Sequence, residues 1–475
     1  MTLTLSQFWK AQGTGPWPWD KAAELPLVEV LVDSRLVVEG SLFVALGGEQ
    51  TDGHLFVEDA FARGARAALV QKPVDGCGTL LDVTQPIAGN SQLRLPVCFL
   101  VPDTLDALQQ FAAYWRRQHS HCRVVGITGS IGKTTTKELI AAVLRQHFCT
   151  LMSPGNYNSE IGLPLTLLRL RPEIEWVVQE MGMYDLGEIA HLAEIAQPNV
   201  GVVTNVGPTH LERLGTIERI AEAKAELPQA LPCDGLAILN GDDARVRAMG
   251  SLTKAEKVLY YGLGLDNDLW AGDIQTRGLE GLRLCLHFRD QSVHARLPLL
   301  GRHSVHGALA AAAVGLSQGL AWDEIISGLR DKSSRIRLLV VPGIRGTTIL
   351  DDVYNASPAS TIAALNLLAE MEGRKVAVLG DMLELGSYEQ KGHRVVGRRA
   401  RDVVSLLVTV GKLGRLIADE ALAVGMQPSA VHAVADNSEA VAVLQQTLTP
   451  GDFVLIKGSR SVAMETIVAE LARGD

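Results

Sequence analysis

The segment Gly126–Thr135, with the sequence GITGSIGKTT, constrains the fold of this chain more strongly than any other feature. It overlaps the end of the apolar run Arg123–Thr128 and opens the helical pattern Thr134–Gln146. A strand, a glycine-rich turn and a helix in this order present the free N–H groups and the positive dipole end of the helix to an anion. The segment therefore predicts a phosphate-binding loop in an open α/β sheet.

The residues of this loop have separate predicted tasks. Glycines let the backbone approach the phosphates, Lys133 reaches the terminal phosphates, and the Thr134 hydroxyl holds Mg²⁺. We expect the nucleotide to contact Gly129, Ser130, Gly132, Lys133, Thr134 and Thr135. Ile127 stands where the usual pattern G-x-x-x-x-G-K-[ST] begins with glycine, so the alternative is a glycine turn without a ligand. The Gly-Lys-Thr-Thr run and both flanking elements favour the loop.

Strand and helix patterns divide the chain into three blocks. We expect an α/β fold of three domains: a small N-terminal α/β domain over residues 1–105, a central parallel-sheet ATPase domain over 106–332, and a C-terminal Rossmann-like domain over 333–475. Leu282–Phe288 and Val293–Leu299 alternate like an antiparallel pair. The other predicted strands are Val28–Val32, Ser41–Leu46, Ala67–Val70, Val97–Val101, Trp176–Glu180, Val200–Asn205, Leu236–Leu239, Thr347–Leu350, Lys375–Leu379, Ser405–Val410 and Phe453–Lys457.

Composition excludes several classes of protein. The net charge of -9 gives no indication of a nucleic-acid partner. No apolar run is long enough for a membrane helix, and the first residues lack the basic and apolar parts of a signal peptide. The six cysteines are scattered without a C-x-x-C spacing, which argues against a disulfide framework or a cysteine zinc site. We expect a cytoplasmic monomer with reduced thiols.

Three further side chains in the central block are candidates for chemistry. Glu180 closes a predicted strand and His210 follows another, where ligands bind in open α/β sheets. Lys224 lies on a predicted helix. By spacing alone, Glu180 is equally a capping carboxylate, His210 a loop residue and Lys224 a solvated lysine.

Over nearly its whole length the chain resembles the Mur ligases, the ATP-dependent amide-forming enzymes of peptidoglycan precursor synthesis. The loop TGSIGKTT is similar to their nucleotide loop, including the non-glycine at Ile127. The motif DSR at 33–35 is similar to their UDP-sugar-binding domain. Four segments resemble motifs of the family branch that adds a dipeptide to a nucleotide-sugar tripeptide. They are GNYNSEIGLPLT at 155–166, DDVYNASP at 351–358, VLGDMLELG at 378–386 and KGSR at 457–460.

The resemblance implies a magnesium site. Glu180 and His210 match the family's magnesium ligands, and Lys224 matches a lysine that the family carbamylates. A carbamate is anionic and helps to hold a second Mg²⁺, whereas an unmodified ammonium is repelled by the ion. We therefore expect two magnesium ions and a carbamylated Lys224.

The resemblance also implies substrate contacts. Ser34 and Arg35 would lie near the UDP-N-acetylmuramoyl group, and Asn158 near the reacting phosphate. Arg337, or less favourably Arg335, would lie near the γ-phosphate. The nucleotide side would also use Asp352, Tyr354 and Asn355.

The implied activity is the ATP-dependent joining of D-alanyl-D-alanine to UDP-N-acetylmuramoyl-tripeptide through an acyl phosphate. A sibling branch that adds a single amino acid is the first alternative, but its D-N-P-R motif is absent. The second is a nucleotide-gated binding protein that has lost the chemistry. It is supported by one departure, since Ser304 and Gly307 replace two asparagines of the family. The second of these helps to hold adenine, so a changed base contact is expected, with His306 as a candidate.

Overall fold

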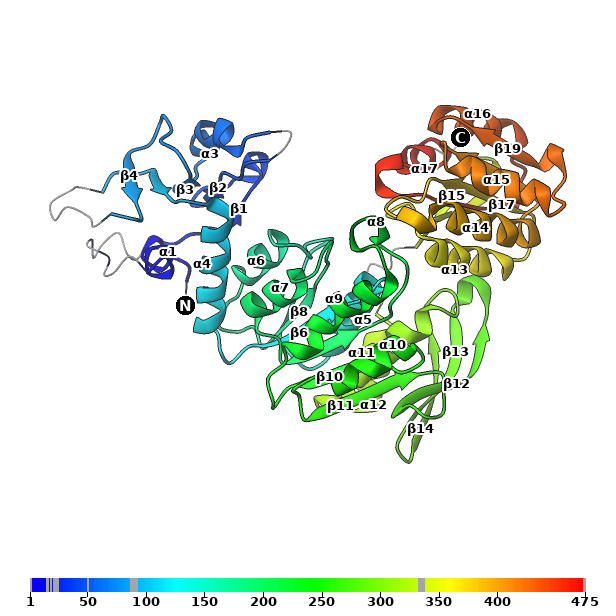
Figure 1. The fold of residues 1–475 in the computed structure, drawn as a ribbon, viewed down its shortest axis with the longest axis horizontal. Helices are drawn as coiled ribbons and strands as arrows, with labels where there is room; N and C mark the ends of the chain where they lie inside the picture. The colour runs from blue at the N-terminus through cyan, green and yellow to red at the C-terminus, as the bar shows by residue number, and fades with distance from the viewer. Residues whose placement is uncertain are drawn as a thin grey trace. The chain divides into compact units, whose positions relative to one another are not determined.

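The computed structural model describes residues 2–13, 17, 19, 25–48, 51–85, 93–331 and 338–472. These residues form three sheets with helices packed on them, which confirms the predicted α/β class (Figure 1). The chain divides into two compact units. The first contains residues 1–126, 148–182 and 188–200, and the second contains 127–147, 183–187 and 201–475. Within the described ranges, every helix is too short or too polar to span a lipid bilayer.

The N-terminal sheet lies in the first unit and has the strand order β1-β2-β3-β5-β4, with every pair parallel. Its strands are β1 (Val30–Leu31), β2 (Leu42–Val44), β3 (Ala67–Val70), β4 (Thr79–Asp82) and β5 (Val97–Leu100). The helices of this region are α1 (Leu5–Ala11), α3 (Val57–Ala62) and α4 (Thr104–Gln118). All four residues of β3 are buried, as expected for a parallel strand covered on both faces.

The central sheet has nine strands in the order β14-β13-β12-β11-β10-β9-β6-β8-β7. Its strands are β6 (Arg123–Thr128), β7 (Thr150–Met152), β8 (Trp176–Glu180), β9 (Val200–Val203), β10 (Leu236–Asn240), β11 (Lys257–Gly262), β12 (Leu269–Thr276), β13 (Leu282–Phe288) and β14 (Gln291–Leu297). Strand β13 pairs antiparallel with both β12 and β14, so the alternation in Leu282–Phe288 and Val293–Leu299 indicated the β13–β14 pairing correctly.

The helices of the central region are divided between the two units. The first unit contains α6 (Gly162–Leu167) and α7 (Glu188–Ala196). The second contains α5 (Lys133–Leu144), α8 (Leu211–Leu214), α9 (Ile217–Gln229), α10 (Ala244–Ala248), α11 (Ser304–Ser317) and α12 (Trp322–Leu329). Helix α11 is buried almost all round because its Ala-rich sequence lets it lie close to α5.

The C-terminal sheet has the order β15-β16-β20-β17-β18-β19, with only β15 antiparallel. Its strands are β15 (Leu339–Gly343), β16 (Thr347–Asp351), β17 (Lys375–Gly380), β18 (Leu406–Val410), β19 (Val431–Val434) and β20 (Phe453–Lys457). Its helices are α13 (Pro358–Ala369), α14 (Glu389–Val403), α15 (Gly414–Ala423), α16 (Asn437–Thr447) and α17 (Glu465–Leu471).

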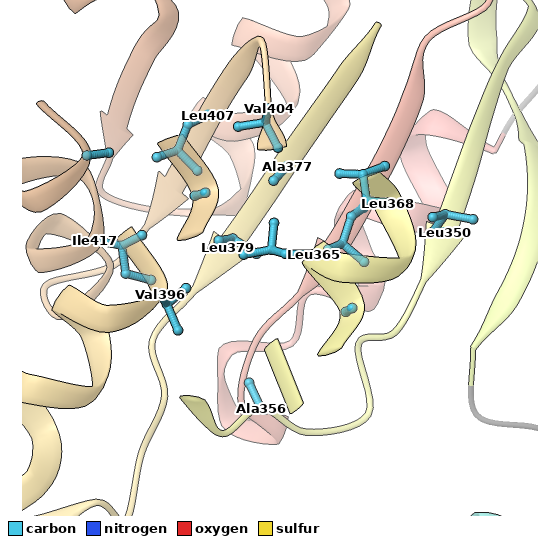
Figure 2. Packing of buried hydrophobic residues seen from close by; sticks show 14 of the residues in the cluster. Leu350, Ala356, Leu365, Leu368, Ala377, Leu379, Val396, Val404, Leu407 and Ile417 are labelled. Carbon is cyan, nitrogen blue, oxygen red and sulfur yellow. The ribbon is translucent and has the colours of Figure 1, made fainter. Parts of the chain in front are cut away.

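This sheet buries apolar side chains on both faces. Leu379 of β17 belongs to a cluster with Val396 of α14 and Ile417 of α15 (Figure 2). The neighbouring Val378 belongs to the opposite cluster, with Leu444 of α16. Successive side chains of a strand point to opposite faces, so the continuous apolar run of β17 supplies both cores.

Candidate functional site

The predicted phosphate loop lies between β6 and α5. Gly129 and Gly132 have φ angles of 146° and 83°, which side chains disfavour. A Cβ at Gly129 would lie 1.9 Å from Oγ1 of Thr204, so the loop also needs glycine for close packing. The loop conformation is therefore specified by its glycines.

The segment after β9 holds the loop from the side. Asn205 binds Ile131 with both ends of its amide, accepting from the backbone N–H at 3.0 Å and donating to the carbonyl at 2.9 Å. Oγ of Ser130 accepts from the N–H of Gly207 at 2.8 Å and lies 3.0 Å from the carbonyl of the same residue. These bonds fix the backbone before any phosphate has to order it.

Helix α5 begins with the features of an anion site. Its N-cap is Gly132, no side chain caps its first N–H groups, and no acidic residue lies in its first turn. Lys133 begins the helix and its Nζ donates to the carbonyl of Gly129 at 2.7 Å. Thr134 is nearly buried and Thr135 is partly exposed. The start of the helix and the positive end of its dipole favour a phosphate here.

Ile127, the departure from the usual loop pattern, is fully buried inside β6. A large apolar side chain at this position packs in the core and does not meet the phosphate side of the loop. The glycines that the geometry requires come later, at 129 and 132. The missing first glycine therefore leaves the loop intact.

Lys224 lies on α9 and is buried, with 2% of its surface exposed. Burial, with a smaller contribution from the charge of Lys133, lowers the pKa of Lys224 well below that of a free lysine. Among the described residues, no carboxylate lies within ion-pair distance of its amine. The solvated-lysine alternative is therefore wrong for Lys224.

Glu180 and Asn158 lie together in the first unit. Glu180 ends β8 and is 1% exposed, and its Oε1 accepts from Nδ2 of Asn158 at 2.9 Å. The carbonyl of Asn158 accepts from the N–H of Gly182 at 2.8 Å. The structure thus joins the candidate carboxylate to the segment that carries the predicted Asn158.

His210 precedes α8 and lies in the second unit. Its Nδ1 is 2.8 Å from Oε2 of Glu384, although no well-aligned hydrogen bond forms there. The ring of Tyr184 lies edge-on to it, with centroids 5.2 Å apart. His210 lowers the pKa of Glu384, with a smaller effect of Arg213. His210 therefore has a carboxylate neighbour that sequence reasoning did not identify.

The loop that carries Glu384 follows β17 and is held at several points. Oδ1 of Asp381 accepts from two N–H groups at the start of α15, at 2.9 and 2.7 Å. Nε2 of His393 accepts from the N–H of Met382 at 3.0 Å, and Oγ of Ser459 accepts from that of Leu383 at 2.9 Å. The quoted GDMLELG motif is thus a fixed turn between a strand and a helix.

The predicted nucleotide residues of the C-terminal region surround Lys457. Its ammonium lies 2.7 Å from Oδ2 of Asp352 and donates to the carbonyl of Asn355 at 2.8 Å. Lys457 is 2% exposed. The guanidinium of Arg460 lies 5.4 Å from the ring centre of Tyr354. The structure therefore brings Asp352 and Asn355 together, and the lysine that does so was not among the predicted site residues.

Gly307 and His306 lie on α11, where the sequence departs from the family's asparagines. A Cβ at Gly307 would lie 3.3 Å from Leu139 of α5, so this position faces the neighbouring helix. Nε2 of His306 lies 2.8 Å from Oδ2 of Asp242. Asp242 also accepts from the N–H groups of Leu263 and Gly264. Whether His306 contacts adenine stays a prediction.

The remaining candidates are placed differently. Ser34 is buried, and after Arg63 it helps to lower the pKa of Asp59. Arg35 is exposed and paired with Asp33 at 2.7 Å. Arg337 and Arg335 lie outside the described residues. Within the described ranges, no three His, Cys, Asp or Glu side chains gather closely enough to hold a metal ion.

Three family models match the chain. They are the Mur ligase family catalytic domain over residues 27–115, the Mur ligase middle domain over 127–315 and the Mur ligase glutamate ligase domain over 336–460. Together they span most of the sequence.

Individual relatives match the chain over nearly its full length. The chain is 38% identical over 453 residues to a UDP-N-acetylmuramoyl-tripeptide–D-alanyl-D-alanine ligase of Synechocystis, covering 94% of this chain and 92% of the relative. The ligase of that name in Escherichia coli is 38% identical, with 95% of both chains covered. A crystal structure of MurF from Acinetobacter baumannii matches with a TM-score of 0.84 and 31% identity over 99% of both chains. One of MurF from Thermotoga maritima in complex with ADP matches with a TM-score of 0.77 and 28% identity over 94% of this chain and 97% of that one.

Proposed function

The chain belongs to the Mur ligase family, and from this premise we propose that it joins D-alanyl-D-alanine to UDP-N-acetylmuramoyl-tripeptide with ATP. One observation carries the proposal: relatives named for this reaction are 38% identical to the chain along more than nine-tenths of both lengths. The product is a peptidoglycan precursor. The cytoplasmic location expected from the sequence stays a prediction.

The reaction needs the tripeptide carboxylate to be activated, because a carboxylate is a poor electrophile. Its oxygen attacks the γ-phosphorus of ATP, which forms an acyl phosphate and releases ADP. The amine of D-alanyl-D-alanine then attacks the acyl carbon, and inorganic phosphate leaves. We assign to Lys133, which begins α5, the stabilisation of charge on the transferred phosphoryl group.

The residues present fit magnesium. The Thr134 hydroxyl and the Glu180 carboxylate are oxygen ligands of the kind that Mg²⁺ prefers. His210, whose side chain is only partly exposed, can supply one imidazole nitrogen. We assign these three residues to magnesium binding. Bound magnesium neutralises charge on the phosphates and the substrate carboxylate.

Lys224 fits the site only after modification. An ammonium would repel a divalent cation, but burial lowers the pKa of the Lys224 amine and so favours its neutral, nucleophilic form. The neutral amine attacks carbon dioxide, loses one proton and becomes a carbamate, whose oxygens suit Mg²⁺. A carbamate signal in ¹³C NMR after incubation with ¹³C-bicarbonate tests this step, and Lys224→Ala should lose both that signal and most ligation.

Substrate contacts are assigned by region. We place the UDP-sugar on the N-terminal domain over 1–105, near Ser34 and Arg35, and the reacting phosphate near Asn158. The C-terminal domain over 333–475 would bind the dipeptide and part of ATP. Its nucleotide residues would be Asp352, Tyr354, Asn355 and Arg337.

Phosphate release tests the proposed function directly. The purified chain should release phosphate only when ATP, UDP-N-acetylmuramoyl-tripeptide and D-alanyl-D-alanine are all present, and mass spectrometry should detect the pentapeptide product. Single amino acids replace the dipeptide as controls. Release with a single amino acid, or none with the complete mixture, would overturn the proposal.

A further inference from the structure

Two residues from different sheets meet beside α8. His210 follows the central strand β9, and Glu384 follows the C-terminal strand β17. Nδ1 of His210 and Oε2 of Glu384 are 2.8 Å apart. The side chains are 24% and 52% exposed. The contact therefore links the central and C-terminal sheets within the second unit.

The backbone on both sides is specialised for this contact. His210 and Glu384 have φ angles of 57° and 62°, a conformation that costs free energy in residues other than glycine. Gly386 has a φ of 50°, and a Cβ there would lie 2.9 Å from the Cα and backbone N of Glu212. Only glycine lets the turn Gly386–Tyr388 lie this close to α8.

Among the described residues, the contacts of the His210 ring involve Nδ1 and the ring face, and Nε2 is left for another group. Tyr184 packs edge-on against the imidazole, and Arg213 lies over the Tyr184 ring at 5.5 Å. The one carboxylate recorded within ion-pair distance of His210 among the described residues is Glu384. A histidine that binds a metal through one nitrogen commonly presents the other to a carboxylate, which fixes its tautomer and orientation.

We propose that Glu384 is a positioning residue for His210. Its carboxylate holds Nδ1 protonated, which leaves Nε2 as the nitrogen that binds the magnesium ion. The inference rests on the proposed role of His210 as a magnesium ligand. Because Glu384 belongs to the C-terminal sheet, the metal affinity of the central site depends on the turn Gly386–Tyr388 lying against α8.

The test uses the full chain with Mn²⁺ as the probe, in the presence of a non-hydrolysable ATP analogue. Electron paramagnetic resonance of free Mn²⁺ gives the binding constant. Glu384→Gln and Glu384→Ala should weaken binding about 10–100-fold, the range for lost carboxylate partners of metal-binding histidines. In ligation assays the magnesium concentration for half-maximal rate should rise by a similar factor. Glu212→Gln, which removes an exposed charge two residues from His210, is the matched control and should change neither value.

Two further variants separate positioning from simple docking. Gly386→Ala should weaken Mn²⁺ binding without altering either side chain of the pair. In a His210→Ala background, Glu384→Ala should cause no further loss, because its effect acts through the ring. Unchanged Mn²⁺ binding in folded Glu384 variants would overturn the inference while the role of His210 stood. Unchanged binding in His210→Ala would overturn the metal role itself, and ligation by the wild-type chain would still test the proposed function.

Discussion

The buried His393 of α14 gives a prediction whose size can be worked out from the structure. The ring is completely buried, its Nε2 accepts from the N–H of Met382 at 3.0 Å, and its Nδ1 lies 2.7 Å from the carbonyl of Glu389. This arrangement requires a neutral ring with the proton on Nδ1. His393→Leu replaces the ring by an apolar side chain of similar size and leaves the Met382 N–H without its acceptor.

The expected loss is about 2 kcal/mol, because an unsatisfied buried donor costs about 1–3 kcal/mol. Hydrogen exchange reports it locally, since a loss of that size raises the open population about 30-fold at roughly 1.4 kcal/mol per tenfold. The Met382 amide should exchange faster by that factor in His393→Leu. His393→Gln can present an amide oxygen to the same N–H and should retain part of the protection. Equal protection in the wild type and both variants would refute the reasoning.

The same residue predicts a pH dependence. Burial lowers the pKa of His393 below its ordinary value of 6.5, opposed by the Glu389 carbonyl and the charges of Asp381 and Glu389. The unfolded chain therefore binds the proton more readily, and stability is lost as the pH falls below about 6.5. Urea unfolding of the wild type at pH 7.5 and 5.5 should show this loss, and His393→Leu should show less of it. A wild-type slope no steeper than that of the variant would contradict the assignment.

Three other substitutions test the site. Gly129→Ala places a Cβ 1.9 Å from Oγ1 of Thr204 and should abolish ATP binding by calorimetry; retained affinity would mean that the loop tolerates the clash. Lys457→Met leaves the largely buried Asp352 carboxylate without its cation and should lower the free energy of unfolding by about 3–5 kcal/mol in denaturant titrations, whereas a loss below about 1 kcal/mol would show that the pair is dispensable. Lys133→Ala should lower ligation at least about 100-fold, as other lost charge-stabilising donors do, with an unchanged melting temperature; a small change in rate would remove Lys133 from the phosphoryl step.

Strong apolar runs made much of the fold predictable. Strands β3, β6, β8 and β20 have the predicted bounds, since each is a short apolar run, and β13 has them because its residues alternate. Strands β4, β7, β11, β12, β15 and β19 were not predicted. Of these, β4 and β19 lie at sheet edges and are only partly buried, so their sequences lack a continuous apolar run.

The candidate site was predictable where its chemistry is local in sequence. The phosphate loop itself is built from neighbouring residues, and the predicted strand, glycine turn and helix are all present. The Lys457–Asp352 and His210–Glu384 contacts join residues more than one hundred positions apart, and no periodicity reports such a pair. Glu384 and Lys457 stood inside quoted motifs, but only the fold shows what they touch. The predicted domain boundaries and the role of Arg337 stay predictions.

The place of β20 in the C-terminal sheet has a consequence for synthesis of the chain. This last strand, which begins at Phe453, lies between β16 and β17, which end much earlier in the chain, at Asp351 and Gly380. While the chain emerges from the ribosome, the strand that lies between β16 and β17 is missing. Their facing apolar edges therefore stay open until residue 457 is made. The loop that Lys457 fixes is completed at the same moment. We therefore expect the C-terminal sheet to fold only after residue 457 has left the ribosome, so that ribosome-bound chains ending before residue 453 should be digested readily by protease from residue 338 onward.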